Sequence, residues 1–417
     1  MGVRRAGQPS IDGAMRWAST LSRRPDAADA FAECVEPIGA QLRGGSPDLV
    51  LVFASPHHAA GAQRMSALAR QRFPRALLVG CTGGGVIGDA HEVEEGPALS
   101  LTAAVLPGVT LTGFHVDATS LPPPEAAAAE WRAVVGVEAE REPKLLLLGD
   151  PFTLDASALV SGLDRAYPGL PKFGGLASGG RRPGENRLLL GASVHRSGAV
   201  GVAFSGDVAV DTVIAQGCRP IGKPMLVTRC QSGLVQELEQ GKPLRALTEL
   251  YGSLSSRDRQ LMETSLFLGI DMREDRVEYD PGELLVRNLV GADQETGALA
   301  VAAELRPMQV VQFVLRDART AEEDLRRMLE RCRRAKGRGR PAGALLFSCM
   351  GRGAGLFGRP DHDTALFEEN LGPTPLGGFF CNGEIGPVGG TTFLHGYTSA
   401  FALFGSAHPE PEVHAAR

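Results

Sequence analysis

Short, unbroken apolar runs alternate with amphipathic stretches along most of this chain. The run at 49–54 (LVLVFA) follows a stretch at 26–42 whose apolar side chains recur at helical spacing. A second helical stretch at 60–72 and a second apolar run at 76–79 come next. A continuous apolar run is typical of a strand buried on both faces, whereas an amphipathic helix repeats its apolar positions about every three to four residues. These segments therefore predict a βαβ unit with two parallel strands.

Similar elements return later in the chain. A strand at 145–148 precedes a helix at 156–167, and a strand at 344–347 precedes a short helix at 364–370 and a last strand at 398–404. Other segments add strands to these units. The segment at 98–116 predicts a hairpin around its Pro-Gly dipeptide, and residues 187–215 predict a meander.

A glycine spacing marks an internal repeat. Its positions in the two copies are Gly80, Gly85, Gly88 and then Gly378, Gly383, Gly386. A weaker third copy begins at Gly174. Glycine permits positive φ and close approach of two backbones, so packing and turns explain most of these positions. A loop whose N–H groups hold an anionic ligand group is the alternative.

These elements predict an α/β protein of layered mixed sheets with flanking helices, built from repeated βαβ-plus-hairpin units in two domains. The N-terminal domain is expected to span 15–220 and the C-terminal domain 221–405. Tails at 1–14 and 406–417 are expected to be disordered. The composition agrees, because 43% hydrophobic and 22% charged residues are ordinary for a globular protein.

Charge and cysteine spacing argue against several classes of function. The net charge of −5 gives no general attraction to nucleic acid or to an anionic membrane. The basic segment 331–340 (RCRRAKGRGR) is explained by a helix C-terminus that runs into a loop, with nucleic-acid binding as the alternative. The seven cysteines show no CxxC spacing, which argues against a zinc site and a disulfide framework. With neither a signal peptide nor a long apolar run in the sequence, we expect a cytoplasmic protein that does not enter a membrane.

Several segments resemble the FIST family. Residues 49–88 (LVLVFASP…ALLVGCTGGGVIG) resemble the FIST N-terminal domain. Segments that resemble the FIST C-terminal domain are 279–291 (YDPGELLVRNLVG), 344–353 (ALLFSCMGRG), 375–386 (PLGGFFCNGEIG) and 395–399 (HGYTS). The resemblance implies a bacterial type of sensor for small molecules such as amino acids, and a partner protein that passes on the signal. It also implies a relation to the FIST region of an F-box ubiquitin-ligase adaptor, whose ligase link is not expected here because few residues precede 49.

A group of polar residues in the C-terminal segments is the candidate ligand site. Its members are Cys349, Arg352, Asn382, Glu384, His395 and Tyr397. The loops that carry Arg352 and Glu384 leave strands of one βαβ unit, and parallel strands gather such loops at one sheet edge. Arg352 could bind a carboxylate in bidentate fashion while Asn382 and Glu384 take an ammonium or amide group. A structural Arg352–Glu384 salt bridge, with Asn382 capping a turn, is the alternative.

Catalytic chemistry is a weaker hypothesis. Cys349 and His395 would suit a thiol nucleophile and its base, with Glu384 orienting the imidazole, if the three side chains meet. Cys349 ends an apolar strand, however, where inert packing thiols are common.

Nucleotide and metal sites are weaker still. GxGxxG matches at 83–88 and 353–358 both follow strands, but acidic residues follow the first and no immediate helix follows the second. The sequence Asp361-His362-Asp363 is explained by a loop and a helix cap, with metal ligation as the alternative. We therefore expect no cofactor and no metal.

The function that these observations favour is the sensing of a small ligand, an amino acid or a small carboxylate, in intracellular signal transduction. A protein-interaction scaffold without a metabolite is the alternative, and a Cys/His-dependent enzyme is the third hypothesis. A sensor is expected to lose its ligand on Arg352→Ala while keeping its fold.

Overall fold

The computed structural model describes residues 2–4, 13–123, 125–239, 241–272, 284–335 and 340–408. The chain divides into two compact units. Unit 1 comprises Met1–Ile214, Met328–Leu394 and Thr398–Arg417, and unit 2 comprises Ala215–Arg327 and His395–Tyr397. Unit 2 is therefore an insertion, after which the chain returns to unit 1. The expected domains, 15–220 and 221–405, divide the chain at a single point instead. This division stays a prediction.

The two expected tails are only partly described. Gly2–Arg4 form strand β1, which pairs with β8 (Val109–Val116). Residues 5–12 and 409–417 lie outside the described residues.

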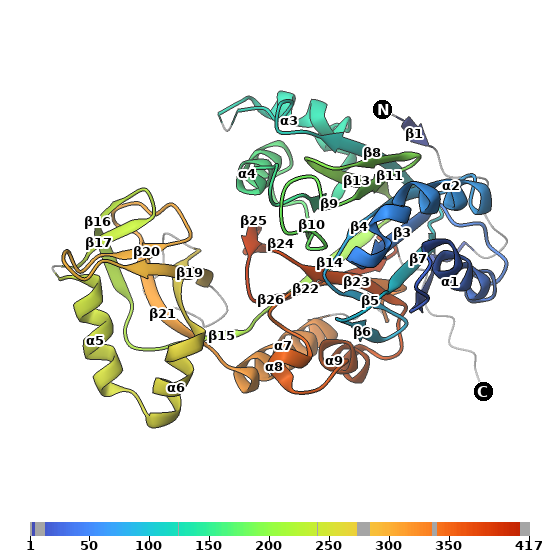
Figure 1. The fold of residues 1–417 in the computed structure, drawn as a ribbon. Coiled ribbons are helices and arrows are strands. Elements are labelled where there is room, and N and C mark those ends of the chain that lie inside the picture. Colours follow the sequence, from blue (N-terminus) through green and yellow to red (C-terminus); the bar gives the residue numbers. More distant parts are fainter. Residues whose placement is uncertain are drawn as a thin grey trace. The chain divides into compact units, whose positions relative to one another are not determined.

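Unit 1 is built from three repeats with the same order of elements (Figure 1), although three elements of the third repeat, at 209–216, 318–335 and 391–395, include residues of unit 2. The first consists of β2 (Arg16–Ser22), α1 (Ala27–Gln41), β3 (Leu49–Ala54), α2 (Ala62–Arg72), β4 (Leu77–Thr82), β5 (Val86–Gly88), β6 (His91–Val93) and β7 (Leu99–Val105). The second consists of β8 (Val109–Val116), α3 (Ala128–Val135), β9 (Lys144–Gly149), α4 (Ala156–Ala166), β10 (Lys172–Leu176), β11 (Leu188–Leu190), β12 (Ser193–His195) and β13 (Ala199–Gly206). The third consists of β14 (Ala209–Gln216), α7 (Ala318–Ala335), β22 (Gly343–Cys349), α9 (His362–Leu371), β23 (Leu376–Cys381), β24 (Glu384–Val388), β25 (Thr391–His395) and β26 (Thr398–Gly405). The predicted βαβ-plus-hairpin repeat is confirmed.

Each repeat gives its hairpin to the sheet of another repeat. The first sheet has the order β12-β11-β4-β3-β7-β2, so it takes the hairpin of the second repeat. The second sheet, β1-β8-β13-β9-β10-β24-β25, takes the hairpin of the third. The third sheet, β14-β26-β22-β23-β5-β6, takes the hairpin of the first, and Figure 1 shows β5 beside β23. This cyclic exchange ties the three repeats into one unit.

The repeated glycine is required by close packing of the two parallel strands in each repeat. A Cβ atom at Gly80 would lie 1.9 Å from the carbonyl oxygen of Val52 on the neighbouring strand. At Gly174 and Gly378 the corresponding distances, to Leu147 and Leu346, are 1.9 Å and 1.8 Å. These two glycines also have positive φ values, +145° and +155°. The packing explanation is therefore confirmed at these positions.

The hairpin expected at 98–116 is wrong. The two strands form at the expected places, as β7 and β8, but they belong to different sheets. The meander at 187–215 is likewise split, because β13 and β14 lie in different sheets. In each case the turn leads the chain into the next sheet. There the second strand pairs with a strand that is distant in sequence, and not with the strand that precedes it.

The core of unit 1 lies between the inner faces of the three sheets. The Phe404 ring of the third sheet lies 4.5 Å from the Trp17 ring of the first sheet. It also lies 5.7 Å and 5.6 Å from the rings of Phe173 and Phe204 in the second sheet. Helices α1 and α2 pack on the outer face of the first sheet, and α3 and α4 on that of the second. This layered α/β arrangement agrees with the predicted fold class.

Unit 2 is a small barrel with its own core. Its strands follow the order β15 (Cys218–Pro220), β21 (Val310–Arg316), β16 (Met225–Gln231), β17 (Leu234–Leu238), β20 (Leu299–Val301), β19 (Leu284–Ala292) and β18 (Leu266–Asp271). The last of these also pairs with β21, which closes the barrel. Helices α5 (Pro243–Ser253) and α6 (Ser256–Ser265) complete this unit. Of the FIST-like segment 279–291, residues 279–283 lie outside the described residues.

No helix within the ranges given above is long and apolar enough to cross a bilayer.

Candidate functional site

Loops from all three repeats meet at the carboxyl ends of β22 and β23. Cys349 and Cys381 are register partners at these ends. The Phe380 N–H donates to the Gly85 carbonyl at 3.0 Å, and the Asn382 N–H donates to the Leu176 carbonyl at 2.9 Å. The carboxyl edge of parallel strands is the usual place for a ligand in α/β proteins. We call Cys349, Arg352, Asn382 and Glu384 at this edge the carboxyl-edge cluster.

Arg352 is buried and holds a bidentate ion pair within unit 1. Its Nε lies 2.8 Å from Asp363 Oδ2, and its Nη2 lies 2.9 Å from Asp363 Oδ1. Only 1% of Arg352 is exposed. The ion-pair partner is therefore Asp363 at the start of α9, and not Glu384 as one interpretation of the sequence had it. The remaining nitrogen, Nη1, has no hydrogen-bond partner among the described residues.

Asp363 is stabilised as a carboxylate by two neighbours. Burial alone would raise the pKa of Asp363, but the charge of Arg352 and hydrogen bonds from Arg352 and His362 outweigh it and hold this pKa well below its usual value. The His362 ring stacks on Phe357 of the short helix α8 (Ala354–Phe357) with centroids 3.3 Å apart. The candidate metal sequence Asp361-His362-Asp363 is thus used in protein contacts.

Glu384 is buried at the start of β24. Its Oε2 accepts hydrogen bonds from Thr398 Oγ1 at 2.7 Å and from Thr398 N at 3.2 Å. Burial raises the pKa of Glu384 to about 8, although these hydrogen bonds and the charge of Arg352 oppose the rise. Its Oε1 has no hydrogen-bond partner within the described ranges. At neutral pH this side chain is mainly a neutral carboxylic acid.

The other predicted site residues fall in two groups. In unit 1, Cys349 is half-buried and Asn382 is exposed. His395 and Tyr397 belong to unit 2, where the Tyr397 hydroxyl donates to Asn288 Oδ1 at 2.6 Å. The Tyr397 ring also packs on Phe267, with centroids 4.2 Å apart. A meeting of the Cys349 thiol with the His395 imidazole stays a prediction.

Glu92 belongs to this region but was missed from the sequence. It lies on β6 of the exchanged hairpin, and its Oε1 accepts a hydrogen bond from the Thr364 N–H of α9 at 2.8 Å. Burial and the Asp363 charge raise the pKa of Glu92 to about 8. Its only signal in the sequence is the acidic run after the first GxGxxG match, which argues against a phosphate at this loop.

The loop of the second GxGxxG match binds a side chain of the protein itself, the carboxylate of Glu94. Its Oε1 accepts a hydrogen bond from the Ala354 N–H at 2.7 Å. A Cβ atom at Gly353 would lie 2.4 Å from the Glu94 carboxylate. The Glu94 carboxylate thus lies against the backbone N–H group that would bind a phosphate in a nucleotide-binding loop.

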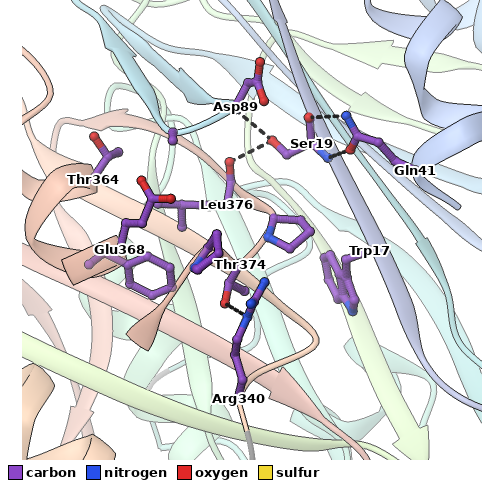
Figure 2. Close-up of a pocket in the computed structure, with 13 residues that line it drawn as sticks. Trp17, Ser19, Gln41, Asp89, Arg340, Thr364, Glu368, Thr374 and Leu376 are labelled. Carbon is purple, nitrogen blue, oxygen red and sulfur yellow. Dashed lines mark hydrogen bonds between the residues drawn. The ribbon is translucent and has the colours of Figure 1, made fainter. Parts of the chain in front are cut away.

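A separate pocket of about 410 Å³ opens at the other ends of the same strands (Figure 2). Its lining combines apolar side chains (Trp17, Phe367, Pro373, Pro375, Leu376), charged ones (Asp89, Arg340, Glu368) and polar ones (Ser19, Gln41, Thr364, Thr374). Arg340 precedes β22 and Leu376 begins β23, so the pocket lies at the amino ends of these strands. The sequence offered no signal for it, because its residues come from distant segments.

Fold and site together define a mixed α/β protein of three exchanged repeats with a polar cluster at the carboxyl edge of its parallel strands. The FIST N domain model matches residues 48–240, and the FIST C domain model matches residues 243–387. The chain belongs to the FIST family. The FIST C match spans both compact units, because the inserted barrel interrupts the third repeat.

Similar proteins include relatives in two kingdoms. An uncharacterized protein of Mycobacterium tuberculosis (strain ATCC 25618 / H37Rv) is 36% identical over 392 residues, which cover 94% of this chain and 100% of the relative. An F-box/LRR-repeat protein of Arabidopsis thaliana is 30% identical over 134 residues, 28% of this chain and 25% of its own length. Among solved structures, a cyanuric acid hydrolase from A. caulinodans covers 94% of this chain and 99% of its own, with 10% identity and a TM-score of 0.37.

Proposed function

We propose that this FIST protein is a sensory protein that binds a small carboxylate, such as an amino acid, at the carboxyl-edge cluster. The observation that carries the proposal is a pair of unsatisfied polar atoms at this edge. Arg352 Nη1 and Glu384 Oε1 both lack a hydrogen-bond partner in the described part of the chain. Buried polar atoms are nearly always hydrogen-bonded in folded proteins, so two at one sheet edge favour a ligand role.

The chemistry of the two groups favours an anionic ligand group. Arg352 keeps its charge, and Glu384 is mainly protonated at neutral pH because burial raises its pKa to about 8. A guanidinium nitrogen and a carboxylic acid can both donate to a carboxylate. The bidentate clamp that the sequence suggested is not available, because Asp363 takes the other two guanidinium positions. Asn382, which is exposed at the same edge, could then bind the amino group or a second oxygen.

Ligand-induced stabilisation tests this proposal. We expect a member of a panel of amino acids and small carboxylates to raise the melting temperature. At a ligand concentration of about 100 times Kd the gain is about 2.7 kcal/mol, which corresponds to a rise of several degrees. The measurement is differential scanning fluorimetry of the full chain.

Two variants locate the site. Asn382→Ala removes an exposed amide, and Arg352→Lys retains the charge opposite Asp363 but loses the Nη1 donor. Both should reduce the ligand-induced rise, measured from each variant's own baseline, whereas Gln71→Ala on α2 should leave it unchanged. A panel without a hit, or a hit with the same rise in all three variants, would contradict the proposal. A sensory role also requires a partner protein that reads the bound state.

A further inference from the structure

The pocket of Figure 2 has a charge arrangement that the proposed carboxyl-edge site does not use. Asp89 lies in the turn between β5 and β6, and Arg340 lies just before β22. Figure 2 shows these two side chains at opposite ends of the pocket, with Leu376 between them. A third charged residue, Glu368 of α9, also lines the pocket.

These charges do not neutralise each other. Among the described residues, none of the ion pairs joins Arg340 to Asp89 or Glu368, and the Arg340 side chain makes its hydrogen bond through Nε to Thr374 Oγ1 at 3.2 Å. The terminal nitrogens of Arg340 thus remain available on one side of the cavity. Opposite charges that share a cavity without pairing are complementary to a ligand that carries both charges.

The neutral polar groups of the pocket are committed to the protein. Ser19 Oγ donates to the Leu376 carbonyl at 2.7 Å and accepts from the Asp89 N–H at 3.2 Å. Gln41 accepts from the Ser19 N–H at 3.0 Å and donates to the Ser19 carbonyl at 3.3 Å. Gln41 therefore covers both backbone groups of Ser19 on the edge strand β2, so a ligand cannot pair with β2 at this residue. Recognition must come from the charged side chains and the apolar wall.

We propose that this pocket binds a small peptide-like zwitterion, a dipeptide with apolar side chains. Its amino group lies at Asp89, its carboxylate lies at Arg340, and its body contacts Trp17 and Phe367. A pocket of about 410 Å³ is at the small end of ligand sites, which suits a molecule of this size. Charges at opposite ends of the pocket select amino and carboxyl groups at the two ends of one molecule, rather than on one carbon as in a free amino acid.

Calorimetric titration of the full chain with leucyl-leucine tests the proposal. We expect the free dipeptide to bind and N-acetyl-leucyl-leucine and leucyl-leucine amide, which each lack one charge, to bind about tenfold more weakly or worse. Trp17 is one of two tryptophans and lines the pocket, so its fluorescence should change on binding.

Matched variants separate this pocket from the carboxyl-edge site. Arg340→Gln and Asp89→Asn alter exposed side chains, so the fold should be retained while affinity for leucyl-leucine falls about tenfold or more. Arg70→Gln, an exposed arginine on α2, should have no effect. Absence of binding at millimolar dipeptide, or equal affinity in all three variants, would overturn the proposal. Neither result depends on Asn382 or Arg352, so the two sites can fail independently.

Discussion

Arg352→Ala is expected to destabilise unit 1 by about 3–5 kcal/mol, because it leaves the buried Asp363 carboxylate without its counter-charge. The expected loss of ligand with a retained fold was a sequence-based prediction that treated Arg352 as a free ligand clamp. The buried ion pair with Asp363 changes that expectation. Urea unfolding of the wild type and the variant at pH 7 measures the difference.

A double variant separates the ion pair from simple loss of packing. Arg352→Met combined with Asp363→Leu removes both charges and retains apolar volume, and it is expected to recover most of the lost stability. The matched surface control is Arg24→Ala, whose ion pair with Glu33 is exposed and should contribute far less to the free energy of unfolding. A loss in Arg352→Ala as small as that of Arg24→Ala would show that the buried pair does not stabilise the fold.

Local patterns were sufficient to predict the elements and the repeat. The helix expected at 26–42 is α1, Ala27–Gln41, and the side chain of its N-cap Asp26 accepts hydrogen bonds from the backbone N–H groups of Ala28 and Asp29. The run at 49–54 is β3, which is buried on both faces. The glycine spacing could be read from the sequence because each copy meets the same steric demand, a carbonyl oxygen of the neighbouring strand.

Partners between distant segments could not be predicted in this way. The residues after β7 suit a hairpin turn. No local feature of the sequence indicates that β7 pairs with β3. Exchange of hairpins between repeats is likewise set by packing across the three sheets.

The candidate site shows the same limit. Arg352 and Asp363 were both singled out, but in different hypotheses, because the face of α9 that meets Arg352 depends on how the helix docks. Glu92 belongs to the acidic run that argues against a bound phosphate, and only the docking of its hairpin against α9 buries it. Its pairing with the Thr364 N–H spans 272 residues of sequence.

The stability of unit 1 is expected to fall as the pH rises from about 4.3, the usual pKa of a glutamate, to about 8. Glu384 and Glu92 both have a pKa raised to about 8 by burial. Below their usual pKa, both carboxyl groups are protonated in the folded and the unfolded chain. Above it, the unfolded chain releases these protons while the folded chain still holds them. Each further rise in pH therefore lowers the free energy of unfolding until the folded groups also ionise.

Glu384→Gln isolates one of these contributions. Glutamine retains an oxygen that can accept from Thr398 but cannot ionise, so the variant should gain roughly 3 kcal/mol relative to the wild type between pH 5.5 and pH 8.5. Urea unfolding at these two pH values measures the gain, and other titrating groups cancel in the comparison. A difference that does not change with pH would mean that Glu384 ionises alike in the folded and unfolded chain, and the donor role proposed for it at the carboxyl edge would fail with it.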